Sequence, residues 1–289
     1  MRFVGMAIAI SIVFGSSGLV RAEGGPFVVS TLRPIHLLVR QVMDGVGEPA
    51  LLGAGVEHAH GGTLSPSERR ALSNADLVFW IGPTLEPGLA RAIDADVSIA
   101  LGEGGGEPDN GSRTDRSDLD GARDKDPHIW LAPDEAIEMI EAIAAALSER
   151  DPSNASVYAA NLEALGAEIT TAKDALQNRL SAVADRPYVV EHNAYAHFAE
   201  AMGLSDAIAL SEDGHSGTSA ARLREVAALV AARGVDCVIV EPGTSDRLAR
   251  ALGRSSMKTV EADPLGRGAD GYVEMLESVA IAFGTCLGD

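Results

Sequence analysis

Basic residues are scarce in this chain, where 23 lysines and arginines stand against 42 aspartates and glutamates and leave a formal net charge of −19. Nucleic acids and anionic membrane surfaces attract proteins through clusters of positive charge. This acidic balance therefore excludes nucleic acid as a favoured partner. It also attracts cations weakly over the whole surface.

Cysteine is nearly absent, since the chain contains only Cys237 and Cys286. In an exported protein, two cysteines suggest a single disulfide. Such a bond would close a loop of about 50 residues and contribute roughly 4 kcal/mol on the chain-entropy model. Two buried free thiols are the alternative.

Long hydrophobic runs are missing as well. The apolar stretch Phe3–Phe14 is too short to span a bilayer, which needs roughly 20 residues. Arg2 precedes it, and small residues occupy the cleavage positions that end at Ala22, so residues 1–22 are predicted to be an export signal. No cysteine for a lipid anchor lies nearby. We expect a periplasmic protein, cleaved near Ala22, without a membrane anchor.

Short apolar, β-branched segments alternate with amphipathic ones along most of the chain. This order predicts βαβ units with parallel sheets, and no repeat of solenoid period interrupts it. The predicted strands are 27–32, 50–52, 76–82, 97–101, 188–190, 207–210, 236–240 and 257–261, and the predicted helices are 37–43, 66–73, 133–147, 219–233 and 272–283.

Residues 151–184 differ from the rest, because apolar side chains recur there at steps of three and four with no proline after Pro152. They predict one helix of roughly 33 residues, about 50 Å long. A helix of that length suits a rigid link between two α/β lobes, residues 23–150 and 185–289. Within the first lobe, residues 102–126 are rich in glycine and charge and are predicted to form a disordered acidic loop.

Histidine is also rare, with seven in the chain, yet four of them lie in three short stretches beside a predicted turn or strand end. The stretches are Glu57–His60, Asp126–Trp130 and Val189–Asn193. Neutral imidazole is a common zinc ligand, and three imidazoles with one open position form a zinc arrangement. The alternative is that each histidine is satisfied by a local hydrogen bond. His36, His197 and His215 are weaker candidates as ligands.

Several motifs carry a resemblance that covers essentially the whole mature chain. They are Leu64-Ser65-Pro66-Ser67, Asn74–Val78 with Trp80–Pro83, His128–Pro133, His192–Tyr195 with Phe198, Glu241-Pro242 and Asp263–Gly266. In this order they resemble the metal-binding proteins of bacterial ABC transporters for zinc and manganese, a family that includes the ZnuA-like periplasmic zinc-binding proteins. The resemblance implies two α/β lobes joined by a long helix, with one metal in the cleft between them.

The resemblance also implies the metal ligands. His60 matches the first family histidine, with His58 as its alternative because zinc members often carry a Glu-His pair. His128 and His192 match the second and third, and Asp263 matches an aspartate that serves as a fourth ligand or a neighbouring carboxylate. A third histidine favours zinc over manganese, whose binders typically carry glutamate there. Cys237 and Cys286 match a disulfide of related zinc proteins.

These residues imply a binding protein that captures Zn²⁺ and delivers it to the membrane permease of an ABC transporter, most simply as a monomer. The rivals are manganese or iron uptake, adhesion, and a zinc-dependent hydrolase. A hydrolase is less favoured because no His-Glu-x-x-His helix is present and no carboxylate stands beside a ligand as an evident base. The family's histidine-rich loop has no counterpart here, because residues 102–126 contain no histidine.

Zinc affinity should fall as the pH drops through about 6, because ligand imidazoles must be neutral to bind the ion. Titration calorimetry at about pH 7 and pH 5 measures the change. An affinity that stays constant between them would contradict a site built from three histidines.

Overall fold

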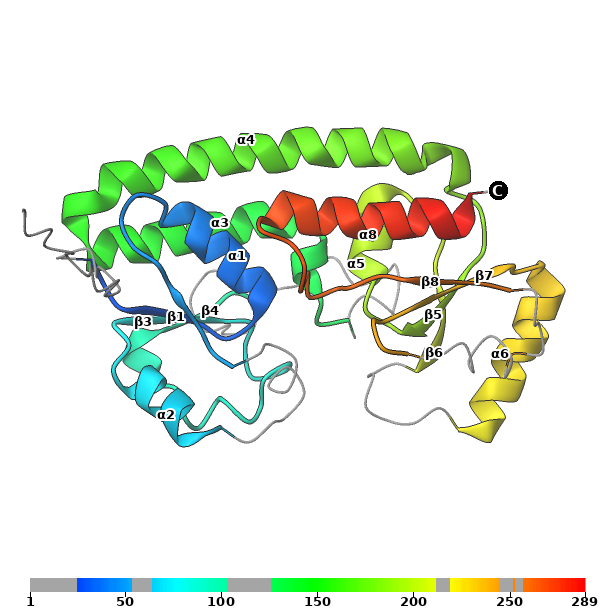
Figure 1. The fold of residues 1–289 in the computed structure, drawn as a ribbon, viewed down its shortest axis with the longest axis horizontal. Helices are drawn as coiled ribbons and strands as arrows, with labels where there is room; N and C mark the ends of the chain where they lie inside the picture. Colours follow the sequence, from blue (N-terminus) through cyan, green and yellow to red (C-terminus); the bar gives the residue numbers. More distant parts are fainter. Residues whose placement is uncertain are drawn as a thin grey trace, which may run out of the picture.

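The computed structural model describes residues 25–53, 64–102, 126–211, 219–244, 252 and 257–288. They form two α/β lobes, as predicted, which lie side by side beneath one long helix (Figure 1). No helix in these ranges is both long enough and apolar enough to cross a membrane. The predicted export signal, and nearly all of the loop predicted to be disordered, lie outside the described residues.

Each lobe contains a four-stranded parallel sheet. The first sheet has the order β2-β1-β3-β4 and the second has the order β6-β5-β7-β8. Parallel strands require crossover helices, which accounts for the alternation in the sequence. The strands are β1 Val28–Ser30, β2 Ala50–Leu51, β3 Leu77–Trp80, β4 Ser98–Ala100, β5 Val189–His192, β6 Ile208–Ser211, β7 Cys237–Val240 and β8 Lys258–Glu261.

Helices cover both faces of these sheets. They are α1 Arg33–Val42, α2 Pro66–Ser73, α3 Pro133–Arg150, α4 Ala155–Leu180, α5 Ala196–Met202, α6 Ala220–Arg233 and α8 Tyr272–Leu287, with 3-10 turns at Ala95–Val97, Ile129–Leu131, Pro152–Asn154 and Ser181–Val183. A capping box begins α2, because Ser65 Oγ accepts the Glu68 N–H while the Glu68 carboxylate accepts the Ser65 N–H. Helix α5 is an element that the sequence analysis did not delimit.

Successive strand residues point to opposite layers, as the pleat requires. On β5, Val189 packs in the layer beneath α6, whereas Val190 packs in a larger core. That larger core is continuous across both lobes and contains residues of α1, α3, α4, α5 and α8. A shared core of this kind opposes large movements of one lobe against the other.

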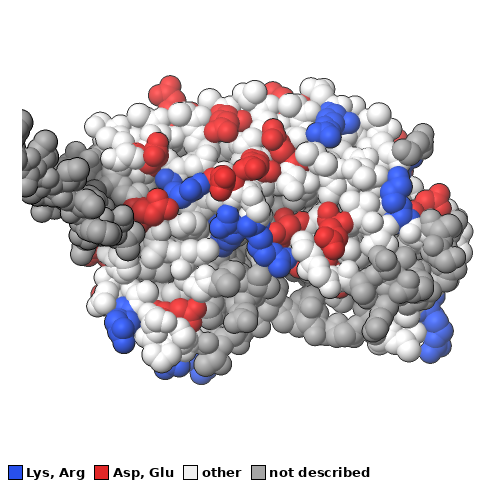
Figure 2. All heavy atoms as spheres, in the orientation of Figure 1, with Lys and Arg blue, Asp and Glu red and all other residues white. Residues whose placement is uncertain are grey.

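The predicted linking helix is α4, which has 26 residues and is extended at both ends by 3-10 turns. Its buried face packs against α3 in one half and against α8 in the other, so it spans both lobes (Figure 1). The carboxylate of Asp151, at the start of this helix, accepts hydrogen bonds from the side chains of Ser153, Asn154 and Tyr158. Figure 2 shows acidic side chains spread over the face that α4 and α8 form, with basic ones among them.

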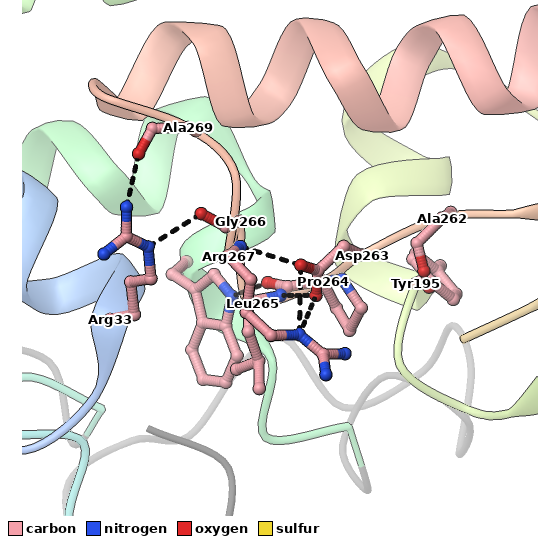
Figure 3. A network of polar contacts seen from close by, with 10 residues as sticks. Arg33, Tyr195, Ala262, Asp263, Pro264, Leu265, Gly266, Arg267 and Ala269 are labelled. Carbon is pink, nitrogen blue, oxygen red and sulfur yellow. Dashed lines mark hydrogen bonds and ion pairs between the residues drawn. The ribbon is translucent and has the colours of Figure 1, made fainter. Parts of the chain in front are cut away.

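The segment between β8 and α8 connects the second lobe to the first. Arg33 of α1 donates from Nε to the Gly266 carbonyl at 2.9 Å and from Nη2 to the Ala269 carbonyl at 2.6 Å (Figure 3). Trp130 Nε1 donates to the Pro264 carbonyl at 2.7 Å, and both groups are buried. These bonds hold residues 264–269 against the first lobe.

The predicted disulfide is present between Cys237 on β7 and Cys286 on α8, which are 49 positions apart. Replacing both cysteines with serine should lower the free energy of unfolding by about 2 to 4 kcal/mol, because the unfolded chain regains the entropy of the open loop. Urea denaturation measures the loss. A reductant should destabilise the wild-type protein similarly and leave the double variant unaffected; equal stabilities throughout would contradict a stabilising bond.

Candidate metal centre

His128 immediately precedes the 3-10 turn Ile129–Leu131 that leads into α3, and only 4% of it is exposed. Asp126 fixes its position from two residues earlier. Asp126 Oδ1 accepts the His128 backbone N–H at 2.9 Å and lies 2.6 Å from its Nδ1. Asp126 Oδ2 accepts the Ala196 N–H at the start of α5. One buried carboxylate therefore ties the His128 segment to the second lobe.

His192 is the last residue of β5 and is 5% exposed. The parallel register pairs Val190 with Ile239, so two residues further on His192 stands opposite Glu241 at the carboxyl end of β7. Its Nδ1 lies 2.7 Å from Glu241 Oε1. The carboxylate of Glu191 in turn accepts the Glu241 N–H at 3.1 Å and the Thr244 hydroxyl at 2.8 Å. This network fixes the turn that carries Glu241.

The imidazoles of His128 and His192, which are distant in sequence, are neighbours in space. Their ring centroids are 5.3 Å apart, and the ring planes are inclined by 57°. Nε2 of His192 is buried and has no hydrogen-bond partner. Buried polar atoms are normally satisfied, so an unpaired imidazole nitrogen beside a second imidazole indicates a binding position for a ligand.

Both carboxylates that contact these rings are ionised. Burial alone would raise the pKa of Asp126, but its hydrogen bonds with the side chain and backbone of His128 lower that pKa overall. Burial would likewise raise the pKa of Glu241, but the hydrogen bond with His192 and the positive charge of Arg267 lower it overall. An ionised carboxylate only accepts hydrogen bonds, so Nδ1 of each ring carries the proton. The lone pair for a metal then resides on Nε2.

Asp263 follows β8 and is paired with Arg267. Its Oδ2 accepts the Arg267 backbone N–H at 2.7 Å and lies 3.2 Å from Arg267 Nε, while Oδ1 accepts the Leu265 N–H at 3.1 Å (Figure 3). Trp130 donates from Nε1 to the carbonyl of Pro264, the residue after Asp263, and its ring centroid is 5.1 Å from that of His128.

The remaining histidines fall into two groups. His58, His60 and His215 lie outside the described residues. His36 is half-buried on α1, where burial, with the charges of Arg40 and Arg33, lowers its pKa to about 4. His197 donates from Nε2 to the Asp126 carbonyl at 2.8 Å and supports the His128 segment. Within the described ranges, no three His, Cys, Asp or Glu side chains form a group able to hold a metal.

The sequence analysis assigned no role to Asp126 or to the side chain of Glu241, although both carried detectable signals. Asp126 stands two residues before His128, the spacing at which an aspartate accepts the backbone N–H of a turn. Glu241 follows a fully buried strand, and ligand-binding groups gather at the carboxyl ends of parallel strands. The carboxylate of Glu191, which precedes His192, contacts the 241–244 turn rather than the ring.

Comparison with known proteins agrees with this arrangement. Residues 28–286 match the family model described as zinc-uptake complex component A, periplasmic. The high-affinity zinc uptake system protein ZnuA of Paracoccus denitrificans is 31% identical, over 98% of this chain and 98% of that protein.

Solved structures share the fold. The periplasmic zinc-binding protein TroA of Treponema pallidum superposes with a TM-score of 0.78 at 20% identity, covering 92% of this chain and 100% of that one. A mutant, manganese-bound periplasmic metal-binding protein of Candidatus Liberibacter asiaticus gives 0.71 at 20% identity, covering 90% and 99%. At these identities the likeness concerns the fold alone, and it is shared by proteins whose titles name different metals.

The parallel-sheet lobes, the buried imidazole pair and a family match over nearly the whole chain lead to one conclusion: this protein belongs to the family of periplasmic components A of zinc-uptake complexes.

Proposed function

We propose that this protein captures Zn²⁺ outside the cytoplasm and delivers it to the membrane permease of an ABC transporter. The observation that carries this proposal is the buried pair of His128 and His192, with Nε2 of His192 unpaired. Each ring is oriented by a carboxylate at Nδ1, the arrangement that typically supports histidine ligands of zinc. The family membership and the printed function of the Paracoccus relative support the same conclusion.

The proposed metal residues are His60, with His58 as its alternative, His128, His192 and Asp263, the last as a fourth ligand or a neighbouring carboxylate. His58 and His60 follow β2 in the sequence, and His192 ends β5 in the other sheet. Three nitrogen ligands suit zinc better than manganese, which prefers carboxylate oxygen. Metal analysis of His58→Ala and His60→Ala decides which of these two histidines binds.

Binding rather than hydrolysis is proposed because the two carboxylates nearest the imidazoles are already engaged. Asp126 and Glu241 each accept a hydrogen bond from a ring nitrogen. A general base in a zinc hydrolase must instead accept a proton from the attacking water. We further propose that residues 1–22 are removed on export near Ala22 and that the mature protein is a monomer without a membrane anchor.

Replacing His192 with alanine should weaken zinc binding by more than the roughly 10- to 100-fold that loss of an outer hydrogen-bond partner costs. The reason is that a nitrogen ligand is removed outright. Competition with a chelating dye measures the affinity. His36→Ala is the matched control and should bind zinc like the wild-type protein; equal losses in the two variants would argue against a role for His192 as ligand.

Replacing Glu241 with glutamine should reduce zinc affinity by roughly 10- to 100-fold, because the neutral amide no longer stabilises the tautomer of His192 that offers Nε2. The same dye competition detects it. Glu261→Gln makes the same charge change at the exposed end of β8 and should leave affinity unchanged. A Glu241→Gln protein that binds zinc as tightly as the control would show that the contact does not support binding.

A further inference from the structure

His197 is the second residue of α5, and only 6% of it is exposed. Its Nε2 lies 2.8 Å from the backbone carbonyl oxygen of Asp126, which is 71 positions earlier in the chain. A carbonyl oxygen only accepts hydrogen bonds, so Nε2 carries the proton of this imidazole. Nδ1 of the same ring is buried without a partner. Within the described part of the chain, the bond to Asp126 is thus the one hydrogen bond of the His197 ring.

Asp126 is held from α5 at a second point. Its Oδ2 accepts the backbone N–H of Ala196, the first residue of α5, at 2.9 Å. Its Oδ1 accepts the His128 backbone N–H at 2.9 Å and lies 2.6 Å from Nδ1 of the His128 ring. Two neighbouring residues of α5 therefore hold the aspartate that orients His128.

The connection between β5 and α5 carries both parts of this arrangement. His192 ends β5, and α5 begins at Ala196. The Ala194 N–H donates to the His192 carbonyl at 2.9 Å, so the chain turns tightly between them. The turn that presents the imidazole of His192 consequently also leads into the residues that hold Asp126, beside His128. This arrangement keeps the ring centroids of His128 and His192 5.3 Å apart.

Further hydrogen bonds tie the rest of the His128 segment to the second lobe. Trp130 Nε1 donates to the Pro264 carbonyl at 2.7 Å, and the Tyr272 hydroxyl donates to the Trp130 carbonyl at 2.7 Å. All of these groups are buried. Although residues 126–131 lead into α3 of the first lobe, these bonds fasten His128 to the second lobe.

We propose that His197 is a positioning residue for the zinc site: from α5 it holds Asp126, and through Asp126 it keeps the imidazole of His128 beside that of His192. This inference rests on the proposed function. A carboxylate orients a ligand histidine only while its own position is fixed, because the hydrogen bond to Nδ1 depends on distance and direction. Ala196 fixes one carboxylate oxygen of Asp126, and His197 fixes the backbone of the same residue.

Replacing His197 with phenylalanine keeps a buried ring and removes the donor to Asp126. Zinc affinity of the purified full-length protein, measured by competition with a chelating dye, should fall by roughly 2- to 10-fold, the scale of one lost hydrogen bond. His197→Gln carries an amide nitrogen at the position of Nε2 and should retain most of the affinity. His197→Asn carries its amide nitrogen at the position of Nδ1 and should lose as much as His197→Phe, which it replaces if that variant does not fold.

Two controls separate positioning from a general effect on packing. Gln177→Leu removes a bond of the same kind at the opposite end of α5, where Gln177 Nε2 donates to the Ala201 carbonyl at 2.7 Å, and should leave zinc affinity unchanged. Asp126→Asn should itself weaken zinc binding. Adding His197→Phe to it should cost less than in the wild-type background, because the carboxylate through which His197 acts is already missing.

The Nδ1–H proton of His128 provides a readout that needs no metal. In NMR spectra of the metal-free protein, this proton should exchange with solvent faster in His197→Phe than in the wild-type protein. His197→Gln should retain slow exchange. The corresponding proton of His192, which Glu241 accepts, should exchange at the same rate in all three proteins.

The outcomes distinguish the inference from the function on which it rests. Equal zinc affinities of the wild-type and His197→Phe proteins, equal losses in His197→Gln and His197→Phe, or an unchanged exchange rate of the His128 proton would each overturn the inference. Failure of the wild-type protein to bind zinc would overturn the proposed function, and the exchange rates would still test how His128 is held.

Discussion

The hydrogen bonds between two carboxylates and the imidazoles are the interactions on which the site depends. Asp126, which is buried, and Glu241, whose side chain is 25% exposed, accept hydrogen bonds from Nδ1 of His128 and His192, and these bonds lower the pKa of both acids although burial would raise it. Without them, either ring could rotate or change tautomer. Because these carboxylates come from a turn and a strand end, the orientation of both rings is set before any ion arrives.

The apolar core and the hydrogen bonds between the two lobes restrict the movement of these side chains. One apolar core runs through both lobes beneath α4, and Asp126 links the His128 segment to the start of α5. Arg33 and Trp130 add direct bonds from the first lobe to the 264–269 segment of the second. Opening of the two lobes would break buried hydrogen bonds as well as apolar contacts, so we expect small local movements to release the ion.

The choice of metal is a separate matter from the fold. Solved structures with this fold include one titled as zinc-binding and one titled as manganese-bound. Donor atoms and the charges around them select among divalent metals. Here the described part of the site offers imidazole nitrogen. The strongly acidic surface attracts cations in general, whereas selection among them falls to these few side chains.

The sequence alone determined the α/β alternation and the long helix, because these depend on local periodicity and on neighbours a few residues away. It also singled out His128 and His192 through their motifs. Only the tertiary structure decided that their rings lie 5.3 Å apart, that Glu241 contacts His192, and that Arg267 holds Asp263. Parallel strands bring residues separated by tens of positions to one edge of a sheet, and such proximity follows from strand order and side-chain packing rather than from local pattern.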